Sequence, residues 1–170
     1  MWRISTMNSS PEPYTLRPHR PDDLPWVISR HGELYTQEFG WDERFEQFVA
    51  GIVAEFEKNF KPKSEKCWIA EVDGKRAGCV FAVKAHEGVA KLRMLLVEPS
   101  ARGLGIGDRL VKECIDFARS VGYRSMILWT SDALHAARKL YERSGFQLIQ
   151  EEPHSMFGPR MMGQTWELGL

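Results

Sequence analysis

The stretch "ARGLGIG" (residues 101–107) joins an apolar run that ends at Val97 to a long amphipathic stretch that begins near Asp108. Three of its seven residues are glycines, at every second position, and an arginine precedes them. Glycine costs conformational entropy, so its repeated use indicates unusual backbone angles or a close approach to the backbone. A glycine-rich turn that leads into a helix presents free N–H groups and the positive end of the helix dipole. The stretch therefore predicts an anion-binding loop.

Two nucleotide-binding motifs compete for this arrangement, and the sequence disfavours both. The phosphate loop of NTPases requires Gly-Lys followed by Ser or Thr, a triplet that occurs nowhere in the chain. The dinucleotide fingerprint requires a glycine three residues after Gly105, where Asp108 stands. That fingerprint also follows its strand directly, whereas here five residues separate Val97 from Gly103. A Rossmann-type oxidoreductase thus stays only as a disfavoured alternative.

The glycine spacing does fit the pattern R-x-x-G-x-G. Residues 102–107 resemble the pyrophosphate loop of the GNAT superfamily of acyl-CoA-dependent N-acetyltransferases. The preceding "LLVEPSARG" is similar to the strand and the V-x-P-x-x-R-G lead of that family, and "AARKLYERSGF" (136–146) is similar to its A-x-x-L-Y-E-x-x-G-F helix. An ordinary tight turn explains one or two glycines, but not the arginine and the downstream helix together.

Hydrophobic periodicity predicts an α/β chain with the element order β-α-α-β-β-β-α-β-α-β-β. The predicted strands cover residues 14–20, the two arms of a hairpin around Asp73-Gly74, and residues 89–97, 125–130, 146–152 and 164–168. The predicted helices run from Asp22 or Asp23 to Gly40, from Asp42 past Phe56, over 110–121, and over 136–143. The family resemblance implies a mixed, mostly antiparallel sheet of about seven strands with a splayed parallel pair and about four helices. Residues 14–170 are expected to form a single GNAT domain after a disordered tail, residues 1–13.

Composition limits the classes of partner. The 170 residues carry a formal net charge of zero, without a basic run, which argues against nucleic acid. Apolar runs such as residues 94–97 are too short to span a membrane. The N-terminal residues "MWRISTMNSSPEP" lack the apolar core of a secretory signal, so a cytoplasmic location is expected. The cysteines Cys67, Cys79 and Cys114 lack metal-ligand spacing and favour buried thiols in a reducing compartment, with a catalytic thiol as the alternative, and no metal site is expected.

The resemblance implies acetyl-CoA as co-substrate, with its pyrophosphate on the loop. The N–H donors would then belong to Arg102, Gly103, Leu104, Gly105, Ile106 and Gly107. A Cβ at Gly105 or Gly107 would stand between the backbone and a phosphate. The pantetheine arm would pair, like an added strand, with the backbone of Leu95, Leu96 and Val97.

Acetyl transfer to an amine requires a neutral amine, a donor for the oxyanion and a proton for the departing thiolate. Tyr141 occupies the position of the family's general acid, and a packing role is the alternative. Two departures from the family pattern are Lys91, where a glutamate is frequent, and Leu134, where an asparagine often contacts the coenzyme. The general base stays open among His31, Glu33, Glu38, Glu98, Glu152 and His154.

The acceptor amine is also open and belongs to a small molecule or a protein. The resemblance implies that residues 31–45, rich in aromatic and acidic side chains, form one wall of its site and that residues 154–168 form the other. Glu33, Glu38 and Trp41 are the predicted acceptor-binding residues, which would suit a cationic amine. We thus expect an acetyl-CoA-dependent N-acetyltransferase that works by direct attack in a ternary complex, either monomeric or a homodimer. A non-catalytic acyl-CoA-binding regulatory module is the alternative that Lys91 and Leu134 motivate.

Overall fold

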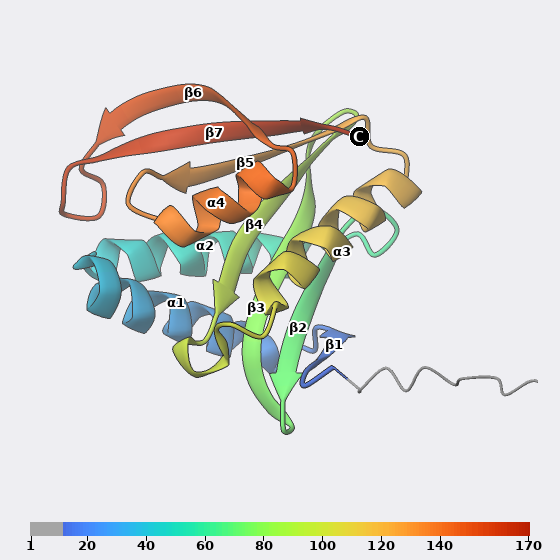
Figure 1. Cartoon of the computed structure of the whole chain (residues 1–170), viewed down its shortest axis with the longest axis horizontal. Helices are drawn as coiled ribbons and strands as arrows, with labels where there is room; N and C mark the ends of the chain where they lie inside the picture. The colour runs from blue at the N-terminus through green and yellow to red at the C-terminus, as the bar shows by residue number, and fades with distance from the viewer. Residues whose placement is uncertain (1–11) are drawn as a thin grey trace, which may run out of the picture.

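A computed structural model describes residues 12–170. Residues 1–11 of the predicted disordered tail lie outside the described residues. Seven strands form one sheet in the order β1-β2-β3-β4-β5-β7-β6 (Figure 1). The strands are β1 (Thr15–Pro18), β2 (Lys66–Val72), β3 (Lys75–His86), β4 (Val89–Val97), β5 (Ser125–Ser131), β6 (Gln147–His154) and β7 (Met161–Gly169). The α-helices are α1 (Asp23–Phe39), α2 (Glu43–Asn59), α3 (Ile106–Ser120) and α4 (His135–Arg143).

Every neighbouring pair of strands is antiparallel except β4 and β5, which are parallel. The predicted mixed sheet and element order are therefore confirmed. A Rossmann-type sheet is mostly parallel, so this topology excludes the oxidoreductase alternative. The predicted loop over residues 153–163 is too long, because Pro153 pairs with Met162 and His154 with Met161. Proline is tolerated there because β6 is an edge strand.

Two hydrophobic clusters pack against opposite faces of the sheet. Figure 1 shows α3 on one face, and α1 and α2 on the other. Alternate side chains of β2 point to opposite faces: Trp68 and Ala70 join the cluster under α3, whereas Cys67 and Ile69 join the cluster under α1 and α2. The apolar face of α3 includes Leu110, Val111, Cys114 and Ala118, all fully buried. Helices thus cover both faces of the sheet along the strands that carry the candidate site.

The parallel pair separates part-way along its length. Residues 89–92 of β4 pair with residues 125–128 of β5. Beyond them, within the described residues, the two strands continue to Val97 and Ser131 without pairing to each other. β5 instead pairs with β7 over its whole length. Figure 1 shows β5, β6 and β7 diverging from the other four strands. The splay that the family resemblance implies is thus present, and among residues 12–170 the stretch 93–97 has no strand partner on the β5 side.

A buried carboxylate fastens α1 to the sheet. Asp23 is fully buried and accepts hydrogen bonds from Arg17 on β1 at 2.8 Å, from Arg76 on β3 at 2.7 Å and from the Arg20 N–H at 2.6 Å. Burial alone would raise the pKa of Asp23, but the hydrogen bonds from Arg17, Arg20 and Arg76 hold that pKa well below its usual range. The ionised carboxylate therefore sets the position of α1, which lines both cavities described below.

Asp23→Asn should lower the free energy of unfolding by about 3–5 kcal/mol, because two arginines would lose their buried partner. Urea unfolding at neutral pH measures this loss. The depressed pKa means that the wild-type contribution is present above the ordinary value of 3.8 and is lost as the pH falls from there toward the folded-state pKa. Asp22→Asn is the control, because the Asp22 side chain is 72% exposed and pairs with Arg76 at its surface. Equal small losses in both variants would contradict this role.

Candidate active site

A β-bulge bends β4 where it leaves β5. Cys79 pairs with Leu96 and Phe81 with Arg93, so Met94 and Leu95 together oppose one residue of β3. Met94 has φ of 55°, a left-handed conformation that a non-glycine residue rarely adopts. Its carbonyl accepts from the Cys79 thiol at 3.3 Å. The bulge redirects the backbone of β4 at the point where the splay begins, and nothing in the sequence marks it, because Met94 is not a glycine.

The glycine-rich loop has the backbone of an anion site. Gly103 and Gly105 adopt φ of 85° and 84°, and α3 begins directly after them. The first hydrogen bond of that helix runs from the Arg109 N–H to the Gly105 carbonyl at 3.1 Å. Within residues 12–170, the N–H groups of residues 103–108 donate to no acceptor of the chain. Six adjacent free donors at a helix N-terminus suit a phosphate group.

A cavity of about 820 Å³, here called the loop cavity, lies beside these donors. The far end of α1, the end of β4, the loop and α4 enclose it. Eight of the nine residues predicted to bind the coenzyme line it, namely Leu95, Leu96, Val97, Arg102, Gly103, Gly105, Ile106 and Gly107. Leu104 does not line it and is 38% exposed.

The three glycines of the loop serve different purposes. Positions 103 and 105 favour glycine because φ is positive there, and a Cβ on either would meet no atom of residues 12–170 within 4 Å. Gly107 lacks a positive φ, but a Cβ there would lie 2.8 Å from Cδ1 of Leu140 on α4. Gly107 is expected to keep a Cβ away from a phosphate. It also allows α3 and α4 to pack closely.

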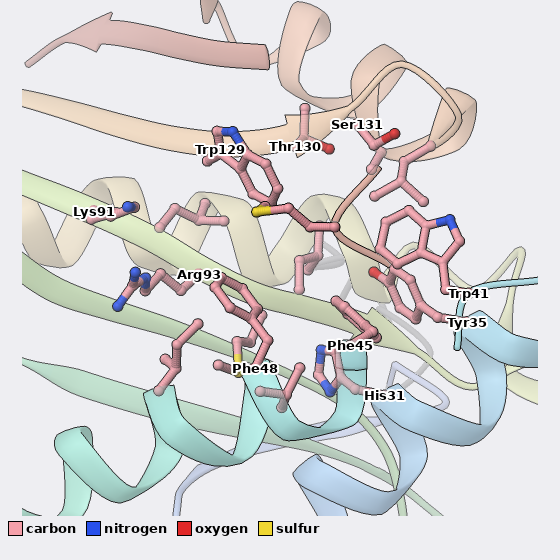
Figure 2. Close-up of a pocket in the computed structure, with 18 of the residues that line it drawn as sticks. His31, Tyr35, Trp41, Phe45, Phe48, Lys91, Arg93, Trp129, Thr130 and Ser131 are labelled. Atoms are coloured by element: carbon pink, nitrogen blue, oxygen red, sulfur yellow. The ribbon is translucent and has the colours of Figure 1, made fainter. Parts of the chain in front are cut away.

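A second cavity of about 340 Å³, here called the aromatic cavity, lies between the sheet and the helices α1 and α2 (Figure 2). Its lining includes the predicted Trp41 and the rings of Tyr35 and Phe45, whose centroids lie 4.6 Å apart. The remaining lining residues are His31, Phe48, Val49, Ile52, Lys91, Leu92, Arg93, Met94, Leu95, Trp129, Thr130, Ser131, Leu134, Ala137, Tyr141, Glu152 and Met156.

The two cavities meet at the splay. Four residues line both of them: Tyr35, Leu95, Leu134 and Ala137. Leu134 is the residue that replaces the family's asparagine, and here it contributes an apolar wall to both spaces. A molecule in the loop cavity and a molecule in the aromatic cavity could therefore meet beside the bulge of β4, which is the arrangement that transfer between two substrates requires.

Tyr141 reaches the aromatic cavity from α4 and is 5% exposed. Burial, and secondarily the nearby Tyr35, raises the pKa of Tyr141 well above its usual value. Its ring also packs edge-on against Phe146, with centroids 5.9 Å apart. The hydroxyl thus stays protonated at neutral pH and is able to donate, while the ring contributes to packing.

Of the six candidate bases, His31 and Glu152 line the aromatic cavity. Nδ1 of His31 donates to the Val27 carbonyl at 2.7 Å, and in the described part of the chain its Nε2 has no partner. Burial lowers the pKa of His31 to about 4, so its ring is neutral at physiological pH. His154 lies outside the cavity, against the ring of Trp129 at 5.4 Å.

The acids of α1 are already paired with arginines. Glu33 lies on the exposed face, pairs with Arg30 and lines neither cavity. Glu98 also holds Arg30, at 2.7 Å. Glu38 lines the loop cavity and pairs with Arg102 of the loop at 2.6 Å. The structure thus brings Trp41 and Tyr141 together in the aromatic cavity and places Glu38 beside the loop.

The charged lining of the aromatic cavity includes two residues that sequence reasoning did not select as binding residues. Lys91 and Arg93 lie two positions apart on β4 and share one face of the sheet. The signal was available, because "VAKLRMLLV" is otherwise an apolar strand and its two basic residues alternate. In residues 12–170 no three His, Cys, Asp or Glu side chains are grouped to hold a metal ion, and none of the helices described there is long and apolar enough to cross a membrane.

Comparisons with known proteins agree with this arrangement. Residues 5–146 match the acetyltransferase (GNAT) family. An uncharacterized N-acetyltransferase of Schizosaccharomyces pombe is 32% identical over 139 residues, covering 81% of this chain and 83% of that protein. N-acetylaspartate synthetase of Xenopus tropicalis is 33% identical over 104 residues, which are 60% of this chain but 38% of that protein. The structure of the acetyltransferase yncA from Salmonella typhimurium with acetyl-CoA has the same fold, with a TM-score of 0.73, 22% identity, and coverage of 93% and 94% of the two chains.

Gly105→Val should weaken the binding of acetyl-CoA by at least about tenfold, equivalent to 1.4 kcal/mol, because the side chain would strain the loop and occupy the space beside its N–H donors. Titration calorimetry measures the affinity. Gly122→Val is the matched control, because Gly122 has φ of 93° and lies at the other end of α3, and a Cβ there would meet no described atom within 4 Å. An unchanged affinity in a folded Gly105→Val variant would remove the loop from coenzyme binding.

Proposed function

The chain belongs to the GNAT family of acetyltransferases and is an acetyl-CoA-dependent N-acetyltransferase, and on this premise we propose that it acetylates a small primary amine bound in the aromatic cavity. The observation that carries the proposal is the junction of the two cavities at Tyr35, Leu95, Leu134 and Ala137. A volume of about 340 Å³ with aromatic walls suits a small molecule. The name of the relative N-acetylaspartate synthetase also favours an acceptor of amino-acid size.

The residues of the loop cavity fit coenzyme A. The free N–H groups of residues 103–108 would hold its pyrophosphate, and Arg102 stands beside them. The backbone of Leu95, Leu96 and Val97, which has no strand partner on the β5 side in the described part of the chain, would pair with the amide groups of the pantetheine arm. Strand-like pairing satisfies backbone groups that would otherwise need water, so the splay becomes a binding feature.

In the proposed reaction the amine nitrogen attacks the acetyl carbonyl carbon, a C–N bond forms, and the C–S bond breaks. A backbone N–H on the β5 side of β4, near Val97, would stabilise the negative oxygen that develops in between. Tyr141 would give the departing thiolate a proton and recover one from water. Before attack, one proton of the acceptor ammonium would pass to a base, for which His31 and Glu152 line the cavity. The second proton, which the nitrogen loses as the C–N bond forms, would pass to water and so balance the proton that Tyr141 recovers.

We also propose that the enzyme works in the cytoplasm. Cys67, Cys79 and Cys114 are buried free thiols, which supports a reducing compartment. The homodimer that the family resemblance leaves open stays a prediction. The family match and the N-acetyltransferase relatives lend no support to the non-catalytic alternative.

Tyr141→Phe should lower kcat by about 10²-fold with little change in the KM for acetyl-CoA, because proton donation matters mainly in the transition state. The rate is read as free thiol released from acetyl-CoA with a primary amine found active in a screen. Tyr123→Phe is the matched control, since the Tyr123 hydroxyl donates to the Ser64 carbonyl at 2.8 Å and lines neither cavity. An equal kcat in Tyr141→Phe would leave Tyr141 with packing alone.

A further inference from the structure

Two basic side chains lie at one side of the aromatic cavity. Lys91 and Arg93 both extend from β4, partly buried, on the face that α2 covers. Figure 2 shows them across the cavity from Tyr35 and Trp41. Tyr35 also lines the loop cavity, so the two cations lie away from the junction where acetyl transfer would occur.

Neither cation has a partner in the described part of the chain. No ion pair or hydrogen bond joins the side chain of Lys91 or Arg93 to residues 12–170, although Arg17, Arg30 and Arg102 are each paired. Glu152 lines the same cavity but is exposed and meets neither of them. A partly buried charge without a counterion is unfavourable, and two like charges on one strand face add repulsion.

The protonation of both groups reflects this arrangement. Burial, and then the charge of Arg93, lowers the pKa of Lys91. Burial lowers the pKa of Arg93, and Glu55 acts in the opposite direction. An anion between the two side chains would offset the cost of burying their charges and the repulsion between them. It would also accept charge-assisted hydrogen bonds, which are the stronger kind in proteins.

We propose that Lys91 and Arg93 form an anion subsite and that the acceptor is an amine with a carboxylate at the opposite end of an apolar body. This proposal rests on the proposed function, since it places the amine at the junction of the cavities. The apolar body would then lie against Phe48, Ile52 and Trp129, and the carboxylate would reach the two cations.

Two probes differ only in the carboxylate that the subsite would bind. Phenethylamine carries an amine and a ring, and 4-(2-aminoethyl)benzoate adds a carboxylate opposite the amine. Titration calorimetry with coenzyme A present should show that wild-type protein binds the benzoate at least about tenfold more tightly, the factor that corresponds to 1.4 kcal/mol. Equal affinities, tighter binding of phenethylamine, or no binding of the benzoate would overturn the proposal.

Variants assign that preference to the two residues. Lys91→Gln and Arg93→Gln should each reduce the ratio of the two affinities, and the double variant should bring it to within about twofold of unity. Lys112→Gln removes an exposed cation of α3 and should keep the wild-type ratio. Arg93→Glu should instead favour 4-(2-aminoethyl)benzylamine, whose second group is cationic. A ratio that survives in the double variant would place the anion elsewhere.

Thiol release from acetyl-CoA with the same probes separates this inference from the proposed function. If the benzoate binds preferentially but no primary amine of a broad panel releases thiol, the subsite stands and the proposed function fails. If both probes are acetylated with equal kcat/KM and bind equally, the proposed function stands and the subsite fails.

Discussion

The parting of β4 from β5 is the constraint on which the rest of the site depends. The two strands pair for four residues each and then separate, so the sheet gives up hydrogen bonds that a continuous parallel pair would make. Backbone groups left without partners are costly when buried, and a co-substrate that supplies strand-like pairing offsets that cost. The loop cavity opens on one side of this gap and the aromatic cavity on the other, with Tyr35, Leu95, Leu134 and Ala137 between them.

The unusual backbone near the gap is held in place from outside it. Met94 is left-handed, and the loop after β4 uses two left-handed glycines. Such conformations persist only where their surroundings fix them. Here α3 packs its buried face on one side of the sheet, and Asp23 binds α1 to β1 and β3 on the other. Contacts outside the gap therefore help to fix the backbone that would bind the substrates.

Local signals made most of the fold predictable. The apolar spacing of α3, the Asp73-Gly74 turn and the glycines of the loop are properties of short stretches, and Tyr141 followed from family resemblance. The features that the sequence did not predict depend on tertiary contacts. The bulge at Met94 depends on its register with β3, Gly107 faces Leu140 across two helices, and Arg30 meets both Glu33 and Glu98. The cavity that Lys91 and Arg93 share forms only when α2 and β5 pack beside β4.

Hydrogen–deuterium exchange with and without acetyl-CoA tests the central claim, that the unpaired backbone at the splay and the loop together hold the coenzyme. The account predicts slower exchange at the amides of residues 95–97 that face β5 and at those of residues 103–108. Within residues 12–170 the first group has no strand partner on the β5 side and the second group has no acceptor, and little change is expected along β6 at the far edge of the sheet. Unchanged exchange at both of the first two segments under saturating acetyl-CoA would contradict it.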